Sequence, residues 1–375
     1  MNFQMNDEQQ MLADSARSFV RANSDVEKHR QNKQLVKLDA ATWQQFAELG
    51  WLAVPFEEKH GGLGLGVTET MVLLESLGEG LIMAPYIATV VMGGGFLRHA
   101  RELVQDEKIP ALIEGKLQLA FAAEEYERVF SLENTAMSGE VQDNGIVLNG
   151  TKACVLNGDQ ADLLVVLVRT EGAVGDRHGL SLMLVDANAE GIERLPHRTV
   201  DGRQGAEVRF SNVLVPHEFL IGELNQAADI ADSVLQEALL AISAECVGSL
   251  SVLLEQTVEY SKTRQQFGVP IGKFQALQHR MTDMFIAMEQ TRSLLLAATL
   301  KTAEGHKDAP RAVHAIKAQL GRGGRKIVQE AIQIHGGMGM TDELGVGHYA
   351  KRVTAADGMF GNADRHLMAM AAARP

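Results

Sequence analysis

The period of the apolar residues changes twice along this 375-residue chain, and this change limits the folds that the chain can adopt. Up to about residue 116, apolar residues recur every three or four positions, which is typical of amphipathic helices. Short β-rich runs follow, and then long helical runs continue to the end. This order predicts an α+β multidomain chain with an N-terminal helical domain (1–116), a middle β-barrel or sandwich domain (117–226) and a C-terminal four-helix bundle (227–375).

The N-terminal zone carries local helix signals. Asn6 and Gln9 have the spacing of a capping box at the start of a helix. The stretch Leu81–Leu97 contains no Asp, Glu, Lys or Arg. It is shorter than the ~20 residues that span a bilayer, and it contains Pro85. We therefore expect a buried helix there, and no membrane span.

Five runs in the middle zone have the composition of β-strands. Turn signals such as Asn144-Gly145 and Asn157-Gly158 separate several of them. No long helical run lies between them, which favours a small barrel or a sandwich. The predicted strands are Leu119–Ala123, Ile146–Leu148, Leu163–Val168, Leu180–Val185 and Ala206–Phe210.

Three long runs predict the helices of the C-terminal bundle: Val234–Tyr260, Phe274–Lys301 and Ala312–Ile334. Long helices with short connections are typical of an antiparallel bundle. The first two runs offer more apolar surface than one side of a bundle needs. We therefore expect a multimer that is built through this bundle.

The charge balance excludes some classes of partner. Lys and Arg number 35 against 48 Asp and Glu, so the formal net charge is −13. Nucleic acid is not expected as a partner, because its binding depends on clustered cations. Two cysteines, Cys154 and Cys246, are too few for a disulfide framework or a cysteine-rich metal site, and we expect no metal. The first ten residues lack the apolar core of a signal sequence, so we expect a cytoplasmic protein.

Two separated motifs carry residues suited to a dinucleotide. The first is Arg-Gln-Gln-Phe-Gly at 264–268, and the second is Gln-Ile-His-Gly-Gly at 333–337. Arginine offers a planar, permanent charge that matches a pyrophosphate, and glycines let a ligand approach the backbone. Either motif alone favours ordinary helix ends, but their joint occurrence favours a cofactor. Neither Gly-x-Gly-x-x-Gly nor a Walker A motif is present, so nicotinamide or ATP binding by those routes is not supported.

Together with the helix–strand–helix order, these motifs resemble the acyl-CoA dehydrogenase flavoprotein family over essentially the whole chain. The resemblance implies FAD as the cofactor. It also implies that the arginine of the first motif reaches across a subunit interface to the FAD of a neighbouring chain. The implied cofactor-binding residues are Arg264, Phe267, Gln275, Gln333, Gly336 and Gly337.

The chain also departs from the family pattern near the flavin. Where the family usually has Thr-Glu-Pro followed by Gly-Ser-rich residues, this chain has Ala123-Glu124-Glu125-Tyr126. The family's Trp-Ile-Thr segment is replaced by Cys154-Val155-Leu156, and Leu156 lacks the hydroxyl that would donate a hydrogen bond to flavin N5. The resemblance therefore implies weaker flavin contacts from this chain's own β-domain than from its C-terminal bundle.

The catalytic base departs from the family pattern as well. Many members use a Glu near the C-terminus to remove an α-proton, and Phe360 occupies the matching position here. Other members place the base at a position that aligns near Ala238. Glu237 is the candidate base, although a shift of one residue turns a helical side chain by about 100°. Glu245, two turns later, is a weaker rival.

The resemblance is strongest to pimeloyl-CoA dehydrogenase small subunits and to subunits of heteromeric steroid-CoA dehydrogenases. It implies α,β-dehydrogenation of a CoA thioester, with an acyl-CoA substrate, a homo- or hetero-tetramer and an electron-transferring flavoprotein as acceptor. The chain is expected to be one subunit of a heteromeric enzyme. A self-sufficient homotetramer that uses Glu237 is one alternative, and a flavin-free structural or binding subunit is another.

Overall fold

The computed structural model describes residues 5–24, 40–126 and 130–373. The capping box is confirmed, because Asn6 Oδ1 accepts a hydrogen bond from the Gln9 amide at 2.8 Å and Gln9 Oε1 accepts one from the Asn6 amide at 3.0 Å. The expected buried helix is also present: a π-helical segment, Ile87–Gly93, continues into α5. The N-terminal helices are α1 (Asp7–Asn23), α3 (Ala40–Glu48), α4 (Val67–Gly78), α5 (Gly94–Leu97) and α6 (Glu102–Ile113).

The middle zone forms one sheet in the order β6-β7-β3-β2-β4-β5-β8, with β1 paired in parallel to β4. In the described part of the chain, β6 and β8 do not pair with each other, so the sheet is open and not a closed barrel. All five predicted strands are present. The strands are β1 (Leu119–Ala122), β2 (Ser138–Gln142), β3 (Gly145–Leu156), β4 (Leu163–Arg169), β5 (Leu180–Asp186), β6 (Ile192–Arg198), β7 (Gln204–Val215) and β8 (Leu220–Ile221).

The C-terminal part is a helical bundle, as expected. The third predicted helix is interrupted by a π-helical segment, Leu320–Gly324. Glycine allows the close packing there, because a Cβ on Gly321 would lie 2.1 Å from the Asp357 carboxylate. The helices are α7 (Ala228–Thr263), α8 (Gln275–Ala303), α9 (Ala309–Gln319), α10 (Arg325–His335), α11 (Gly345–Gly358) and α12 (Ala363–Ala372).

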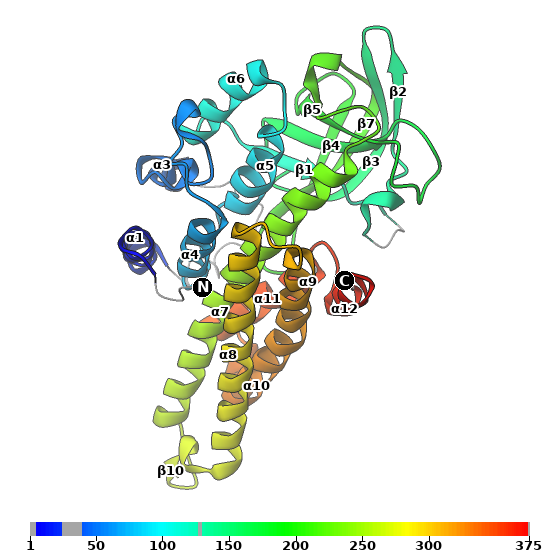
Figure 1. The fold of residues 1–375 in the computed structure, drawn as a ribbon. Helices are drawn as coiled ribbons and strands as arrows, with labels where there is room; N and C mark the ends of the chain where they lie inside the picture. Colours follow the sequence, from blue (N-terminus) through cyan, green and yellow to red (C-terminus); the bar gives the residue numbers. More distant parts are fainter. Residues whose placement is uncertain (1–4, 25–39, 127–129, 374–375) are drawn as a thin grey trace.

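Helix α7 connects the β-domain to the far end of the bundle, where the short strands β9 (Gln265–Gln266) and β10 (Val269–Pro270) form a hairpin (Figure 1). By length and composition α7 could cross a membrane, but 78% of its apolar window is buried inside the fold, as in the core helix of a globular protein. Two glycines bring α4 against α7: a Cβ on Gly78 or on Gly248 would lie 2.0 Å from a backbone oxygen of the other helix. This contact fixes the turn of α7 that carries Glu245.

Candidate active site

The first sequence motif lies at the end of α7 and in the β9–β10 hairpin. Arg264 caps α7, and its amide donates to the Tyr260 carbonyl at 2.9 Å. Phe267 has a positive φ of 54° and is 92% exposed. Its ring meets Phe274 edge to face, with the centroids 6.2 Å apart. The hairpin therefore presents an arginine and an aromatic ring to the outside of the bundle.

The second motif lies beside the first, although about 70 residues separate them along the chain. The rings of Tyr260 and His335 stack with centroids 4.3 Å apart, and the Tyr260 hydroxyl donates to the His335 carbonyl at 3.4 Å. Gly336 has a φ of 62°, which favours glycine. A Cβ on Gly336 or on Gly337 would meet no atom within 4 Å, so both backbones face open space.

The structure thus gathers all six predicted cofactor residues at one end of the bundle, and all six are exposed. We call this region the Arg264 surface; it comprises Arg264, Phe267, Gln275, Gln333, Gly336 and Gly337. Among the described residues, the Arg264 guanidinium forms no ion pair. A free guanidinium, an exposed ring and an open glycine pair are suited to an anionic dinucleotide.

The residues that replace the family's flavin and base positions lie in a different place. Leu156 and Phe360 line a cavity of about 160 Å³ between the β-domain and α11, which we call the closed cleft. Phe130, which lines a neighbouring groove, meets Phe360 edge to face, with ring centroids 5.4 Å apart. The cavity is lined by Met92, Phe121, Ala123, Glu124, Cys154, Leu156, Thr199, Asp201, Arg203, Arg352, Ala355, Gly358, Met359 and Phe360.

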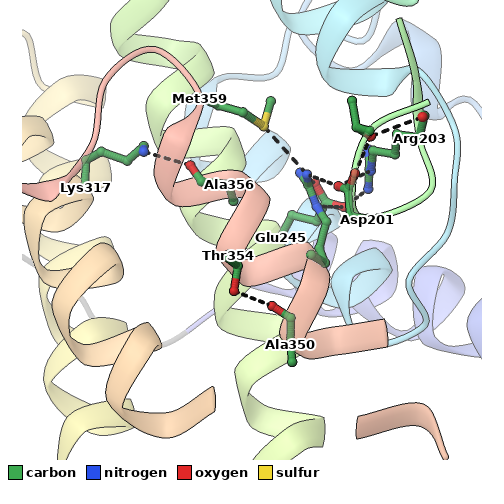
Figure 2. Close-up of polar contacts among 10 residues, drawn as sticks. Asp201, Arg203, Glu245, Lys317, Ala350, Thr354, Ala356 and Met359 are labelled. Atoms are coloured by element: carbon green, nitrogen blue, oxygen red, sulfur yellow. Dashed lines mark hydrogen bonds and ion pairs between the residues drawn. The ribbon is translucent and has the colours of Figure 1, made fainter. Parts of the chain in front are cut away.

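Two carboxylates and two guanidiniums form a cluster beside the closed cleft; we call Asp201, Arg203, Glu245 and Arg352 the charge cluster. Asp201, Arg203 and Arg352 line the cavity, and Glu245 contacts both arginines. Arg352 donates to Asp201 at 2.9 Å and to Glu245 at 2.7 and 3.2 Å. Arg203 also contacts Glu245, and it lies 3.7 Å from Asp201. Figure 2 shows Asp201 and Arg203, from the turn between β6 and β7, beside Glu245 on α7.

The charge cluster is buried, and its members balance one another. Burial alone would raise the pKa of Glu245, but Arg203 and Arg352 outweigh it and hold that pKa below its usual value. The pKa of Asp201 is lowered in the same way, against the effect of burial, by Arg352 and Arg203. Both carboxylates are therefore charged and fully paired. Glu245 is not placed as a free base.

A strained turn holds Phe360 in the closed cleft. Phe360 has a φ of 55°, in the left-handed region that few side chains adopt. Its amide donates to the Glu124 carboxylate, and its carbonyl accepts from His366 Nε2 at 3.2 Å. The next carbonyl, that of Gly361, accepts from Lys317 Nζ at 3.0 Å. These contacts fix the turn despite its strain.

Glu237, the candidate base, lies outside the closed cleft. Its carboxylate pairs with Arg98 at 2.5 Å and lines a separate small cavity beside α4. Its side chain is 28% exposed. Because the carboxylate is held by a guanidinium, it is not poised to accept a proton in the cleft. Its role as a base stays a prediction that an activity measurement must test.

The Arg264 surface and the closed cleft are too far apart to serve one cofactor within one chain. Glu245 contacts two arginines that line the cleft, and Arg264 lies 19 residues further along α7. At the helical rise per residue this separates them by about 28 Å. Figure 1 shows the same separation, with the β-domain at one end of α7 and β10 at the other. Within one chain, the Arg264 surface therefore does not reach a ligand that lies in the closed cleft.

Sequence reasoning named Glu245 as a rival base and Glu124 as a departure from the family pattern, but it missed the charge cluster and the contacts of Lys317. The cluster joins residues 201, 203, 245 and 352, which no local pattern connects. The only signal was a set of charged residues within otherwise apolar or turn segments. The Arg264 surface was found because each of its motifs is local.

The fold and the site define a three-part dehydrogenase with a dinucleotide-binding bundle. The chain matches the acyl-CoA dehydrogenase N-terminal domain at residues 6–116, the middle domain at 120–213 and the C-terminal domain at 228–374. It belongs to the acyl-CoA dehydrogenase family, whose members are FAD-dependent oxidoreductases that act on CH–CH bonds. Its cofactor is FAD.

Several relatives match along nearly the whole chain. The L-prolyl-[peptidyl-carrier protein] dehydrogenase of Serratia sp. (strain ATCC 39006) is 29% identical, over 92% of this chain and 91% of its own. The structure of butyryl-CoA dehydrogenase from Megasphaera elsdenii superposes with a TM-score of 0.91 at 26% identity, covering 100% of this chain and 99% of that one. The ChsE4-ChsE5 complex from Mycobacterium tuberculosis gives 0.90 at 25% identity, covering 99% and 98%.

The two regions differ in how well they fit FAD. The Arg264 surface offers a cation that forms no ion pair among the described residues and a glycine pair that faces open space. The closed cleft has about 160 Å³, whereas sites for small molecules have about 300–1,000 Å³. The chemistry of the Arg264 surface suits the pyrophosphate of FAD, whereas the closed cleft by itself is too small for the cofactor.

Proposed function

We propose that this chain is one subunit of a heteromeric acyl-CoA dehydrogenase. A related partner chain holds FAD and the catalytic base, and this chain completes the partner's site with its Arg264 surface. The observation that carries the proposal is the separation along α7: the residues suited to FAD lie about 28 Å from this chain's own cleft. They therefore serve the cofactor of a neighbour.

The chemistry needs a free carboxylate at the base position, and none of the three positions that the sequence suggested for the base offers one. Dehydrogenation removes a proton from the α-carbon of the CoA thioester, and bound FAD accepts the hydride from the β-carbon. Phe360 cannot accept a proton, Glu245 is fully paired within the charge cluster, and Glu237 is paired with Arg98. These positions favour a base supplied by the partner chain.

Two structural neighbours support a heteromeric assembly. The ChsE4-ChsE5 structure is a complex of two named chains, and so is a Tcur3481-Tcur3483 steroid dehydrogenase, which superposes with a TM-score of 0.88 at 27% identity. On this chain, Phe285, Ile286 and Leu294 leave an exposed apolar groove on α8. A tetramer formed through the bundle would cover that groove. We propose an acyl-CoA substrate, an electron-transferring flavoprotein as acceptor and a cytoplasmic location.

The test is acyl-CoA oxidation with an artificial electron acceptor, for the chain alone and for the chain assembled with a related partner. Loss of a general base typically lowers the rate by about 10²–10⁴, so we expect turnover only in the assembly. Glu237→Gln in this chain should leave that turnover unchanged.

Vigorous turnover by the chain alone that disappears in Glu237→Gln would contradict the proposal and identify the homotetramer alternative. An assembly that forms but contains no FAD would favour the flavin-free structural subunit.

A further inference from the structure

The closed cleft is too small for FAD but large enough for a small molecule. Its volume of about 160 Å³ is close to that of an engineered cavity of about 150 Å³ that binds benzene. One side of the cavity is apolar and is formed by Met92, Phe121, Leu156 and Phe360. A ligand with one ring, or with a chain of about six carbon atoms, would therefore fill it.

The polar side of the cavity carries one unbalanced charge. Within the charge cluster, two carboxylates face two guanidiniums, so the cluster is neutral. Glu124 adds a further carboxylate to the lining. In the described part of the chain, its only polar contact is the backbone amide of Phe360, and no cation pairs with it.

The pKa values of two neighbouring groups, the Glu124 carboxyl and the Cys154 thiol, reflect the charge of this part of the cavity. Burial raises the pKa of the Glu124 carboxyl, and the Phe360 amide offsets only part of that rise. Burial also raises the pKa of the Cys154 thiol, with further contributions from Glu124 and Asp201. Both shifts have the direction expected where negative charge is poorly compensated. A ligand cation placed there would supply the missing partner of Glu124.

A route connects the cavity with the surface. Glu124, Ala123 and Gly358 also line a polar groove of about 380 Å³. Ser131, Asn362 and Arg365 also line this groove, and Asn362 is exposed. Glu124 therefore lies between the apolar cavity and the groove, where it can receive the polar end of a ligand whose apolar end lies inside.

We propose that the closed cleft binds a small apolar amine, with its ring or short chain in the cavity and its ammonium group on Glu124. This site goes beyond the proposed dehydrogenase function, because it requires neither FAD nor turnover. An acyl-CoA would be excluded by its size, and an apolar carboxylate by repulsion from Glu124.

The experiment compares three probes that share a cyclohexane ring and differ in charge: cyclohexylamine is a cation, cyclohexanol is neutral and cyclohexanecarboxylate is an anion. Binding to the full chain in its assembly is followed by ligand-observed NMR and by thermal unfolding. We expect the amine to bind best and the carboxylate worst. Glu124→Gln keeps an acceptor for the Phe360 amide and should weaken amine binding at least tenfold, with little effect on the alcohol. Ala355→Met, which fills the cavity, should weaken the amine and the alcohol together.

Glu237→Gln is the matched control, because it removes a carboxylate outside the cavity and should leave binding of all three probes unchanged. Equal binding of amine and carboxylate, or amine binding that survives Glu124→Gln, would overturn the proposal, as would the absence of binding by any probe. FAD content, measured on the same assemblies, should not change in Glu124→Gln. Failure of the amine-site proposal can therefore be distinguished from failure of the proposed dehydrogenase function.

Discussion

The Arg264 surface and the closed cleft differ in how open they are and in how their charges are paired. The Arg264 surface is exposed: its arginine forms no ion pair among the described residues, and its glycines face free space. The closed cleft is a cavity of about 160 Å³ whose two arginines are paired with carboxylates. Under the proposed function, the Arg264 surface serves the FAD of a neighbouring chain, and the closed cleft holds none.

The comparison also separates two kinds of charged residue. Arg264 has no partner within the described chain, so its charge is available to a ligand. Arg352, on α11, donates hydrogen bonds to Asp201 in the β6–β7 turn and to Glu245 on α7. Its charge therefore joins that turn to the two helices. An unpaired exposed arginine points to binding, whereas a buried arginine with two carboxylates points to architecture.

The largest expected effect lies in the closed cleft. Glu245→Gln leaves Arg203 and Arg352 with one carboxylate between them, and breaking a buried ion pair in this way costs about 3–5 kcal/mol of unfolding free energy. Glu237→Gln is the matched control on the same helix, since it breaks a partly exposed pair worth about 0–1 kcal/mol. Urea unfolding of both variants measures the difference. Equal losses of unfolding free energy in the two variants would show that the charge cluster stabilises the fold no more than the Arg98–Glu237 pair does.

The second effect concerns the Arg264 surface. Arg264→Ala removes a charged donor to a phosphate, a contact worth about 1.5–3 kcal/mol. FAD should bind to the assembly about 10- to 150-fold more weakly, with the unfolding of the chain unchanged. Lys262→Ala, an exposed cation on the last turn of the same helix, is the control. Equal FAD affinity in Arg264→Ala and in the parent assembly would remove Arg264 from the cofactor site.

The smallest effect is a dependence of stability on pH. Burial lowers the pKa of Lys317 to about 8, whereas an unfolded lysine titrates near about 10.4. Between these values the unfolded chain binds more protons, so the free energy of unfolding rises with pH, by about 2 kcal/mol up to pH 10. Lys317→Met should lose this rise.

Urea unfolding at pH 7.5, 9 and 10 checks this expectation. Lys152 contributes to parent and variant alike, because burial also lowers its pKa to about 8. Parallel pH dependences in the two proteins would rule out Lys317 as the titrating group.

Most of the fold could be predicted from the sequence, because apolar periodicity is a local signal. The five predicted strands carry apolar runs, whereas β2 and β6 were missed because most of their residues are exposed. Strand β8 was missed because it has only two residues. The break in the third bundle helix was also missed. It depends on Gly321 packing against Asp357 from another helix, a contact that no window of the sequence contains.

The candidate site could be predicted only in part, for the same reason. Five of the six residues of the Arg264 surface stand in two short motifs, and Gln275 follows the first motif closely, so their chemistry can be read from local sequence. The pairing of Glu237 with Arg98 spans 139 residues, so the sequence shows a carboxylate near a base position but not the guanidinium that holds it. Whether a carboxylate can act as a base, stabilises the fold or binds a ligand therefore depends on ion pairs with residues that are distant in the sequence.

The central claim is that this chain contributes to FAD through the Arg264 surface and not through its own cleft. The direct measurement is the number of FAD molecules per chain, from flavin absorbance and protein concentration, for the chain alone and for its assembly with the partner. We predict almost no FAD on the chain alone, and one FAD for each pair of chains in the assembly. One FAD per chain in the chain purified alone would contradict the account.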